Sequence, residues 1–133
     1  MSAPVICDYS LLRGSKIPLI TLGIFHNREW FPTQAYVDSG ATYSIFSSKV
    51  ADYIGLEYRK GRKINITVGS GETIATYLNR LKIQIGRNRI DALLGFSDEL
   101  GAKINLLGRK DVFDHFKICF DEKNSQVVFY PFE

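Results

Sequence analysis

The stretch that decides the fold is AYVDSGATYS, residues 35–44. A run of strand-forming residues ends directly before Asp38, whose carboxylate stands at the start of a turn made by Ser39 and Gly40. Glycine permits backbone conformations that other residues resist. We expect its N–H and the Ser39 hydroxyl to lie close to the carboxylate, where such donors hold it and favour its charged form. Ala41 is small and leaves room for a ligand.

An ordinary Asp-Ser-Gly turn would contain the same three residues, because all three are common in turns. An apolar residue followed by Asp-[Ser/Thr]-Gly-[Ala/Ser/Thr] is expected by chance in roughly one chain in 200 of this length. The rest of the chain therefore has to support any functional interpretation of this stretch.

Short strand patterns separated by turn residues dominate the remainder of the sequence. Two patches have helical spacing instead: residues 44–54, with Ser47 or Ser48 as the N-cap and Gly55 as the end, and residues 109–116. The sequence predicts a mainly β domain over 17–133, preceded by an N-terminal extension over 1–16. The strands are predicted at 17–25, 30–37, 63–68, 73–85, 90–94, 103–107, 117–120 and 126–132.

The strands predicted at 63–68 and 73–85 form a hairpin, and Gly69-Ser70-Gly71 lies at its tip. The sequence LLG occurs at 106–108, followed by Arg109, and an alternative LLG occurs at 93–95. We prefer the match at 106–108, because Arg109, a predicted helix and two closing strands follow it.

With these features the sequence resembles the retropepsin-like aspartic peptidases, the clan that includes the retroviral proteases and pepsin. The resemblance covers roughly residues 18–132. It rests on the strand leading into Asp38-Ser39-Gly40-Ala41 with Ser44 behind it, on the glycine-tipped hairpin in the position of the family's flap, and on Leu106-Leu107-Gly108-Arg109 as the second family hallmark.

The resemblance implies a closed β-barrel with a glycine-tipped flap and one or two short helices. It also implies an aspartic endopeptidase that needs no metal or cofactor. The residues it assigns to catalysis are Asp38, Ser39 and Gly40. Those it assigns to substrate binding are Ala41, Gly69, Ser70, Gly71 and Leu107, and those it assigns to structural support are Ser44, Gly108 and Arg109.

Two positions depart from the family pattern. Ser39 stands where the family usually has threonine, which keeps the hydroxyl and loses a methyl group. Thr42 stands where retroviral proteases often have an aspartate that pairs with the arginine of the second hallmark. Arg109 is therefore expected to have another partner.

The chain holds one Asp-[Ser/Thr]-Gly triplet, whereas the chemistry requires two carboxylates that share a proton. The second Asp38 is therefore expected from a twofold-related copy of the chain. The resemblance implies that the Ser39 hydroxyls bond across this interface and that residues 127–132 contribute to a shared sheet. The expected partners are a second copy and a peptide or protein substrate.

The composition argues against several other classes. A net charge of +3, from 17 basic and 14 acidic residues, is too small to indicate nucleic-acid binding, and the basic run at 59–63 is interpreted as a solvated loop. Cys7 and Cys119 lack metal-ligand spacing, and a single bridge between them stays possible. No secretion signal and no stretch of about 20 apolar residues is found, which predicts a cytoplasmic protein without membrane contact.

Two alternatives remain open at this point. One is a non-catalytic retropepsin-like domain that binds peptides or assembles. The other is a basic β-barrel that binds nucleic acid through residues 59–63.

Overall fold

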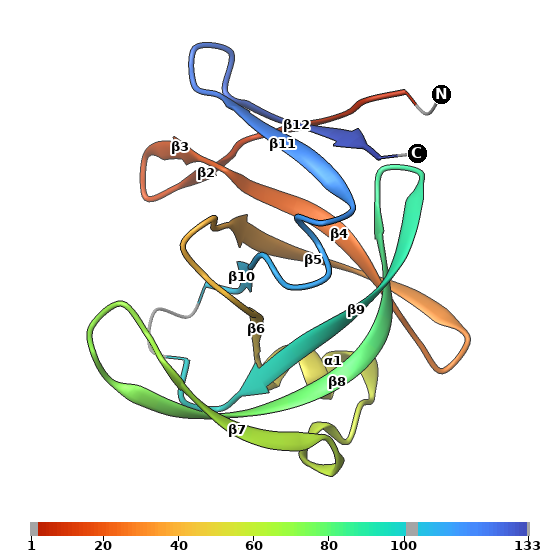
Figure 1. Ribbon diagram of the computed structural model, residues 1–133, viewed down its shortest axis with the longest axis vertical. Helices are drawn as coiled ribbons and strands as arrows, with labels where there is room; N and C mark the ends of the chain where they lie inside the picture. Colours follow the sequence, from red (N-terminus) through yellow and green to blue (C-terminus); the bar gives the residue numbers. More distant parts are fainter. Residues whose placement is uncertain (1–2, 101–103, 133) are drawn as a thin grey trace.

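The computed structural model describes residues 3–100 and 104–132. It is mainly β, as the sequence predicts, and its strands wrap around one core (Figure 1). The strands are β1 (Val5–Asp8), β2 (Ser10–Leu12), β3 (Ser15–Ile17), β4 (Leu19–His26), β5 (Glu29–Val37), β6 (Ser44–Ser47), β7 (Arg62–Thr67), β8 (Thr73–Ile85), β9 (Asn88–Ser97), β10 (Leu106–Leu107), β11 (Phe116–Asp121) and β12 (Gln126–Pro131). The helices are α1 (Ser48–Ile54) and the 3-10 helix η1 (Tyr58–Lys60).

The largest sheet has the strand order β4-β5-β10-β6-β9-β8-β7. Because β4 also pairs with β8, this sheet closes on itself, and β7 remains outside the ring as an edge strand. The interior of the ring is filled by fully buried side chains such as Ile24, Phe46, Ile83 and Phe96. Burying a side chain of this size contributes about 1.5–3 kcal/mol, so this interior is the main source of stability.

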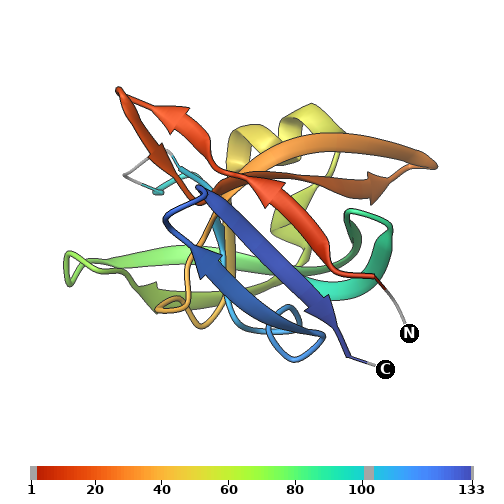
Figure 2. The same cartoon turned by 90° about the horizontal axis from the view of Figure 1, so that it is seen from above.

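A second sheet has the order β1-β12-β11 and lies against the ring (Figure 1). Figure 2 shows β12 in the middle of this sheet, with β1 on one side and β11 on the other. Residues 5–8, which belong to the predicted N-terminal extension, pair with 126–129, and Tyr9 is 8% exposed and part of the core. These N-terminal residues therefore pack with the rest of the chain.

The helix predicted over 44–54 begins later than expected. Residues 44–47 form β6, which pairs with β9 on one side and β10 on the other, so the helix starts only at Ser48. The hydroxyl of Ser47 accepts a hydrogen bond from the N–H of Lys49 at 3.2 Å and caps this start. The end matches the expectation, because Gly55 takes a left-handed conformation with φ 76°.

The helix predicted over 109–116 is wrong. This segment is a series of turns, and Phe116 already belongs to β11. Asp111 has a φ of 63°, which an α-helix does not accommodate, and its carboxylate accepts a hydrogen bond from the N–H of Leu93 at 2.9 Å. The helical spacing reflects burial instead, since Val112 and Phe116 are buried in the core.

The strand predicted over 103–107 is confined to Leu106–Leu107, and Lys103 lies outside the described residues. The predicted hairpin and both closing strands are confirmed within a residue or so at each end. Among the described residues, no helix has the length and hydropathy needed to cross a bilayer.

Candidate active site

Asp38 follows the last residue of β5 and is half-buried. Its N–H donates to the carbonyl oxygen of Leu107 at 3.0 Å. Its carboxylate oxygen Oδ1 accepts a hydrogen bond from the N–H of Gly40 at 2.9 Å, as expected from the tight turn. Ser39 is exposed, and its hydroxyl makes no hydrogen bond with Asp38 in the described part of the chain. The backbone of the turn therefore holds the carboxylate.

A single segment, residues 105–110, supports the loop that follows Asp38. The N–H groups of Arg109 and Lys110 donate to the carbonyl oxygens of Ala41 and Thr42 at 2.9 and 2.8 Å. Together with the hydrogen bond between Asp38 and Leu107, these contacts hold residues 38–42 along their length. The supporting segment lies more than 60 residues away in the sequence.

Gly108 and Ser44 form the tightest part of this support. The N–H of Gly108 donates to the buried hydroxyl of Ser44 at 2.9 Å. A Cβ atom at Gly108 would lie 2.4 Å from the carbonyl oxygen of Tyr43 and 2.9 Å from that of Ala41. Glycine is required here because any side chain would push the loop away.

Arg109 has another partner, as expected from the absence of an aspartate at position 42. Its guanidinium Nη2 donates to the hydroxyl of Thr42 at 3.2 Å, in an exposed position. A neutral hydroxyl replaces the carboxylate that retroviral proteases often have, so this contact is a weaker one than an ion pair.

Asp38 opens into a cleft of about 350 Å³ between its own loop and the hairpin of β7 and β8. Asp38 is the one carboxylate among the described residues that line it. The walls combine apolar side chains with polar backbone and hydroxyl groups in similar measure. The lining residues are Asp38, Gly40, Ala41, Thr42, Tyr43, Ile45, Ile66, Thr67, Val68, Gly69 and Leu106.

The predicted hairpin tip lies only partly on this cleft. Gly69 lines it, whereas Ser70 and Gly71 form the turn beyond it. The N–H of Gly71 donates to the carbonyl oxygen of Val68 at 2.8 Å, and Gly71 has a φ of 89°, which favours glycine. The tip is thus a tight turn whose side chains are exposed and which projects from the body of the molecule (Figure 1).

The two leucine-glycine sequences lie on opposite sides of β6. Leu94 and Gly95 belong to β9, whereas Leu106 and Leu107 form β10, next to Asp38. Leu107 is fully buried, so Leu106 is the residue of this pair that faces the cleft.

Sequence reasoning missed Asn105. Its Oδ1 accepts from the N–H of Ser47 at 2.8 Å, its Nδ2 donates to the carbonyl oxygen of Gln34 at 2.9 Å, and its own carbonyl oxygen accepts from the N–H of Tyr36 at 2.8 Å. Asn105 therefore joins β5 to β6 beside the Asp38 loop. Its position directly before the LLG sequence is the one sequence signal that could have drawn attention to it.

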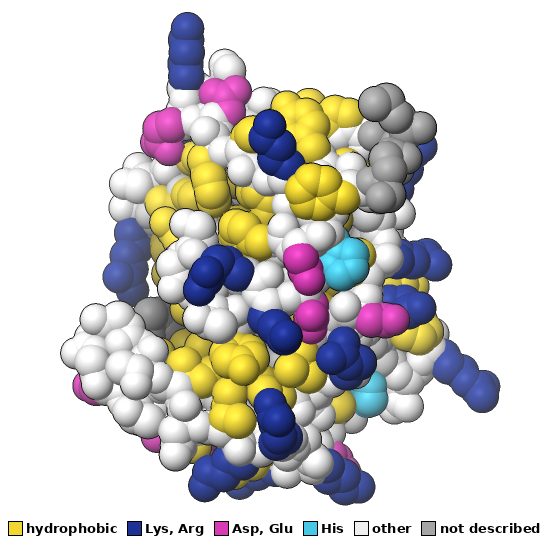
Figure 3. Space-filling view, in the orientation of Figure 1, with side chains coloured by type: hydrophobic (Ala, Val, Ile, Leu, Met, Phe, Trp, Pro, Cys, Tyr) yellow, Lys and Arg dark blue, Asp and Glu magenta, His cyan; other side chains and the backbone are white. Residues whose placement is uncertain are grey.

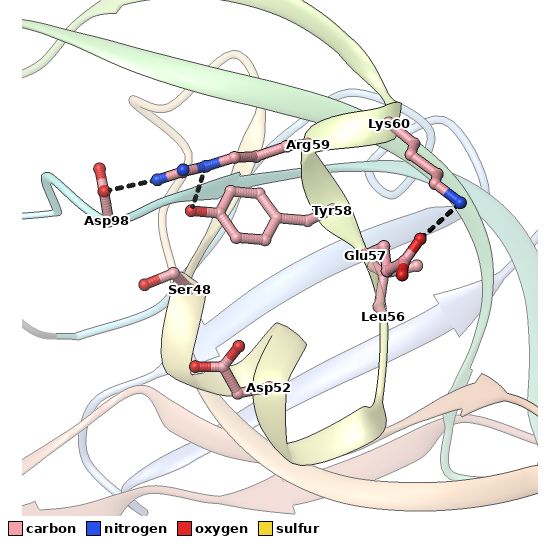
Figure 4. Close-up of a pocket in the computed structure, with 8 residues that line it drawn as sticks. All are labelled: Ser48, Asp52, Leu56, Glu57, Tyr58, Arg59, Lys60 and Asp98. Carbon is pink, nitrogen blue, oxygen red and sulfur yellow. Dashed lines mark hydrogen bonds and ion pairs between the residues drawn. The ribbon is translucent and has the colours of Figure 1, made fainter.

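A larger hollow of about 690 Å³ lies between α1 and η1 (Figure 4). Arg59 pairs there with Asp98 at 2.9 Å and also donates to the hydroxyl of Tyr58, which raises the pKa of the guanidinium. Lys60 pairs with Glu57. Arg59 and Lys60, two cations of the basic run at 59–63, therefore form ion pairs within the chain. The hollow is separate from the Asp38 cleft, because the two share no lining residue.

Comparisons with solved structures show the same fold in aspartic proteases. A retropepsin-like aspartic protease from Rickettsia conorii is 17% identical and superposes with a TM-score of 0.67, covering 96% of this chain and 99% of its own. EIAV protease complexed with the inhibitor HBY-793 is 20% identical, with a TM-score of 0.57, covering 79% of this chain and 92% of its own.

No match was found among curated proteins. The family described as gag-polyprotein putative aspartyl protease matches residues 27–111, which include the Asp38 loop, the β7–β8 hairpin and the LLG sequence at 106–108. This match spans more than half of the chain and contains every element that surrounds the cleft. The chain belongs to the gag-polyprotein putative aspartyl protease family, and it has the retropepsin-like fold.

Proposed function

We propose that the protein is an aspartic endopeptidase that acts as a homodimer, with Asp38 of each chain supplying one carboxylate of the catalytic pair. The observation that carries this proposal is the position of Asp38 as the one carboxylate on the described walls of the cleft beside the β7–β8 hairpin. A single carboxylate provides half of the acid–base pair, and a twofold copy would provide the other half.

The two carboxylates would lie about 3 Å apart and share one proton, because neighbouring like charges cannot both ionise readily. The charged carboxylate takes a proton from a water molecule, whose oxygen attacks the peptide carbonyl carbon. The protonated carboxylate donates its proton to the carbonyl oxygen. The resulting tetrahedral diol collapses, the C–N bond breaks, and the amine leaves with a proton.

The shape and lining of the cleft support an extended peptide as the substrate. Such a peptide binds as an added strand, with main-chain hydrogen bonds for affinity and side-chain pockets for specificity. Ile45, Ile66, Val68 and Leu106 offer apolar walls to its side chains. The β7–β8 hairpin would act as a flap that closes over the peptide and excludes water.

The test is cleavage of a peptide library at acidic and neutral pH. We expect turnover by the wild-type chain, inhibition by pepstatin-type compounds, and loss of turnover by at least about a thousandfold in Asp38→Asn, since an amide cannot act as the base. Asp91→Asn serves as the control, because this exposed carboxylate lies on β9 outside the cleft. Undiminished turnover by Asp38→Asn would exclude the proposed mechanism. Peptide binding without turnover at every pH would favour the non-catalytic alternative.

A further inference from the structure

A hollow of about 450 Å³ lies on the outer face of the large sheet, where β4 pairs with β8. Its lining includes Gly23, Trp30, Pro32, Gln84 and Arg89, and it shares no lining residue with the Asp38 cleft. The β4–β5 and β8–β9 turns lie on the right in Figure 1, whereas the tip of the β7–β8 hairpin lies on the left. The hollow is therefore separate from the proposed peptidase site.

Gly23 leaves the space that forms this hollow. It pairs with Pro32 of β5 on one side and with Gln84 of β8 on the other, so it lies in the interior of the sheet. Its φ is not positive, so the backbone does not require glycine at this position. A Cβ atom at Gly23 would lie 3.2 Å from Cε3 of Trp30 and 3.7 Å from Cβ of Gln84. A glycine of this kind is typical of a place that a ligand approaches closely.

The side chain of Arg89 is held beside this space by its neighbours. Its Cζ atom lies 4.8 Å from the centre of the Trp30 ring, which is a cation–π contact. Its Nε donates to Oε1 of Gln84 at 2.9 Å, and Nε2 of Gln84 donates to the carbonyl oxygen of Gly86 at 2.8 Å. An arginine that is already oriented in this way loses less side-chain entropy when it binds a ligand.

The terminal amino groups of Arg89 remain available to a ligand. Within residues 3–100 and 104–132, neither of them makes a hydrogen bond or an ion pair. The two groups lie in the plane of the guanidinium and match the two oxygens of a carboxylate. The hollow thus combines a prepared contact for a carboxylate with the apolar surfaces of Trp30 and Pro32.

The charges around the hollow favour a small anion. Arg28 and Arg87 occupy the two neighbouring turns, and Lys and Arg side chains gather along this border of the molecule (Figure 3). Lys82 faces Asp91 in register and neither lines the hollow, so their charges offset one another. Asp91 and Glu29 would repel a polyanion such as a nucleic acid, whereas a single carboxylate can avoid them.

We propose that this hollow binds an acidic peptide segment. A glutamate or aspartate carboxylate contacts the terminal amino groups of Arg89, and a neighbouring apolar side chain packs against Trp30 and Pro32. The inference goes beyond the proposed cleavage reaction, since the site does not include Asp38. A protein that reaches both the hollow and the cleft would bind more tightly than one that contacts the cleft alone, because its second contact is intramolecular.

Trp30 provides the readout, because it is the only tryptophan of the chain. The probes are two matched hexapeptide libraries without tryptophan, one with glutamate at a fixed position and one with glutamine there. They are titrated against the Asp38→Asn chain, so that no peptide is cleaved. We expect the glutamate library to change the fluorescence of Trp30 and to bind at least about tenfold more tightly, since hydrogen bonds to charged groups are of this strength.

Arg89→Gln is the decisive variant, because this side chain is exposed and its loss leaves the core intact. It should remove the preference for glutamate. Arg13→Gln is the matched control, since it takes the same charge from the exposed β2–β3 turn and should retain the preference. Gly23→Val should weaken the binding of both libraries, because its side chain fills the hollow.

Three results would overturn the proposal. One is the absence of a glutamate preference, whether the two libraries bind equally or neither changes the fluorescence of Trp30. Another is a preference that survives Arg89→Gln, or a signal that a pepstatin-type compound removes, which would place the peptide in the Asp38 cleft. The last is a single-stranded oligonucleotide that binds more tightly than the glutamate library, which would indicate a nucleic-acid site.

The outcomes also separate this site from the proposed activity. A chain that binds acidic peptides beside Trp30 but whose wild-type form cleaves none keeps this site and loses the endopeptidase. A chain that cleaves peptides but shows no glutamate preference at Trp30 keeps the endopeptidase and loses this site.

Discussion

Gly108 is the residue on which the geometry of the Asp38 loop depends most directly. Gly108→Ala would place a methyl group 2.4 Å from the carbonyl oxygen of Tyr43. We expect the free energy of unfolding to fall by about 1–3 kcal/mol, the usual cost of overpacking. Gly69→Ala is the matched control for stability, since a Cβ atom at Gly69 would meet none of the described residues within 4 Å. Chemical denaturation of both variants checks the difference, and equal stabilities would show that the loop gives way without cost.

Asn105 is expected to matter for activity as well as for stability. Asn105→Ala removes two side-chain hydrogen bonds between β5 and β6, at a cost of about 1–3 kcal/mol. Asn79→Ala is the control, because the Asn79 amide also makes two hydrogen bonds to backbone groups, here as the donor in both, but belongs to β8, outside the cleft. Both variants should lose similar stability, and only Asn105→Ala should lower kcat with little change in KM. Equal kcat values in the two would restrict Asn105 to a structural role.

The Asp38 turn could be predicted from the sequence because its geometry is local. An apolar strand, a carboxylate and a glycine within a few residues determine the hydrogen bond from the N–H of Gly40. Asn105 could not be predicted in the same way. Its partners Gln34 and Ser47 lie 71 and 58 residues away along the chain. Only the folded topology brings β10 between β5 and β6.

At the scale of elements, the two misjudged helices have one physical cause. Residues 44–47 and 109–116 have apolar residues at helical spacing. However, residues 44–47 pair with a distant strand, and the N–H groups of Arg109 and Lys110 donate to the distant loop at residues 41 and 42. Tertiary contacts of this kind override a local periodicity. The hairpin of β7 and β8 was predictable because its strands are neighbours in the sequence and its glycine-rich turn determines the register.

The hydroxyl of Tyr9, which follows β1, bonds to Glu122 in the turn between β11 and β12. This contact makes the stability of the fold depend on pH. Burial and the hydrogen bond to Glu122 raise the pKa of the Tyr9 phenol above its usual value of 10. Above about pH 10 the unfolded chain loses this proton while the folded chain keeps it, so the stabilisation is present below that pH and is lost as the pH rises further.

Tyr9→Phe should therefore flatten the fall of the thermal midpoint between about pH 9 and 12, because phenylalanine has no proton to lose. Near neutral pH the same variant should lose about 0.5–1.5 kcal/mol through the missing hydrogen bond. Tyr130→Phe is the control, since this side chain is 42% exposed. A Tyr9→Phe curve parallel to that of the wild-type chain would show that Tyr9 does not contribute to the alkaline transition.

At the scale of the whole molecule, the fold presents one carboxylate to a cleft and leaves the edge of β11 unpaired among the residues that the structure describes. Under the proposed function, pairing with a second copy is the step that completes the site. A prediction that depends on neither the substrate nor the interface follows from this. If two copies of Asp38 act together, a chain that carries Asp38→Asn is not merely inactive but inhibits any wild-type chain with which it pairs.

Mixing wild-type chains with a tenfold excess of Asp38→Asn and allowing the subunits to exchange should therefore reduce the activity per wild-type chain to roughly a tenth, because nearly every wild-type subunit then pairs with a variant. The readout is the initial rate of peptide cleavage at fixed wild-type concentration. A rate that does not change with added Asp38→Asn would mean that one chain performs the reaction alone, with its second acid group supplied from outside the Asp38 cleft.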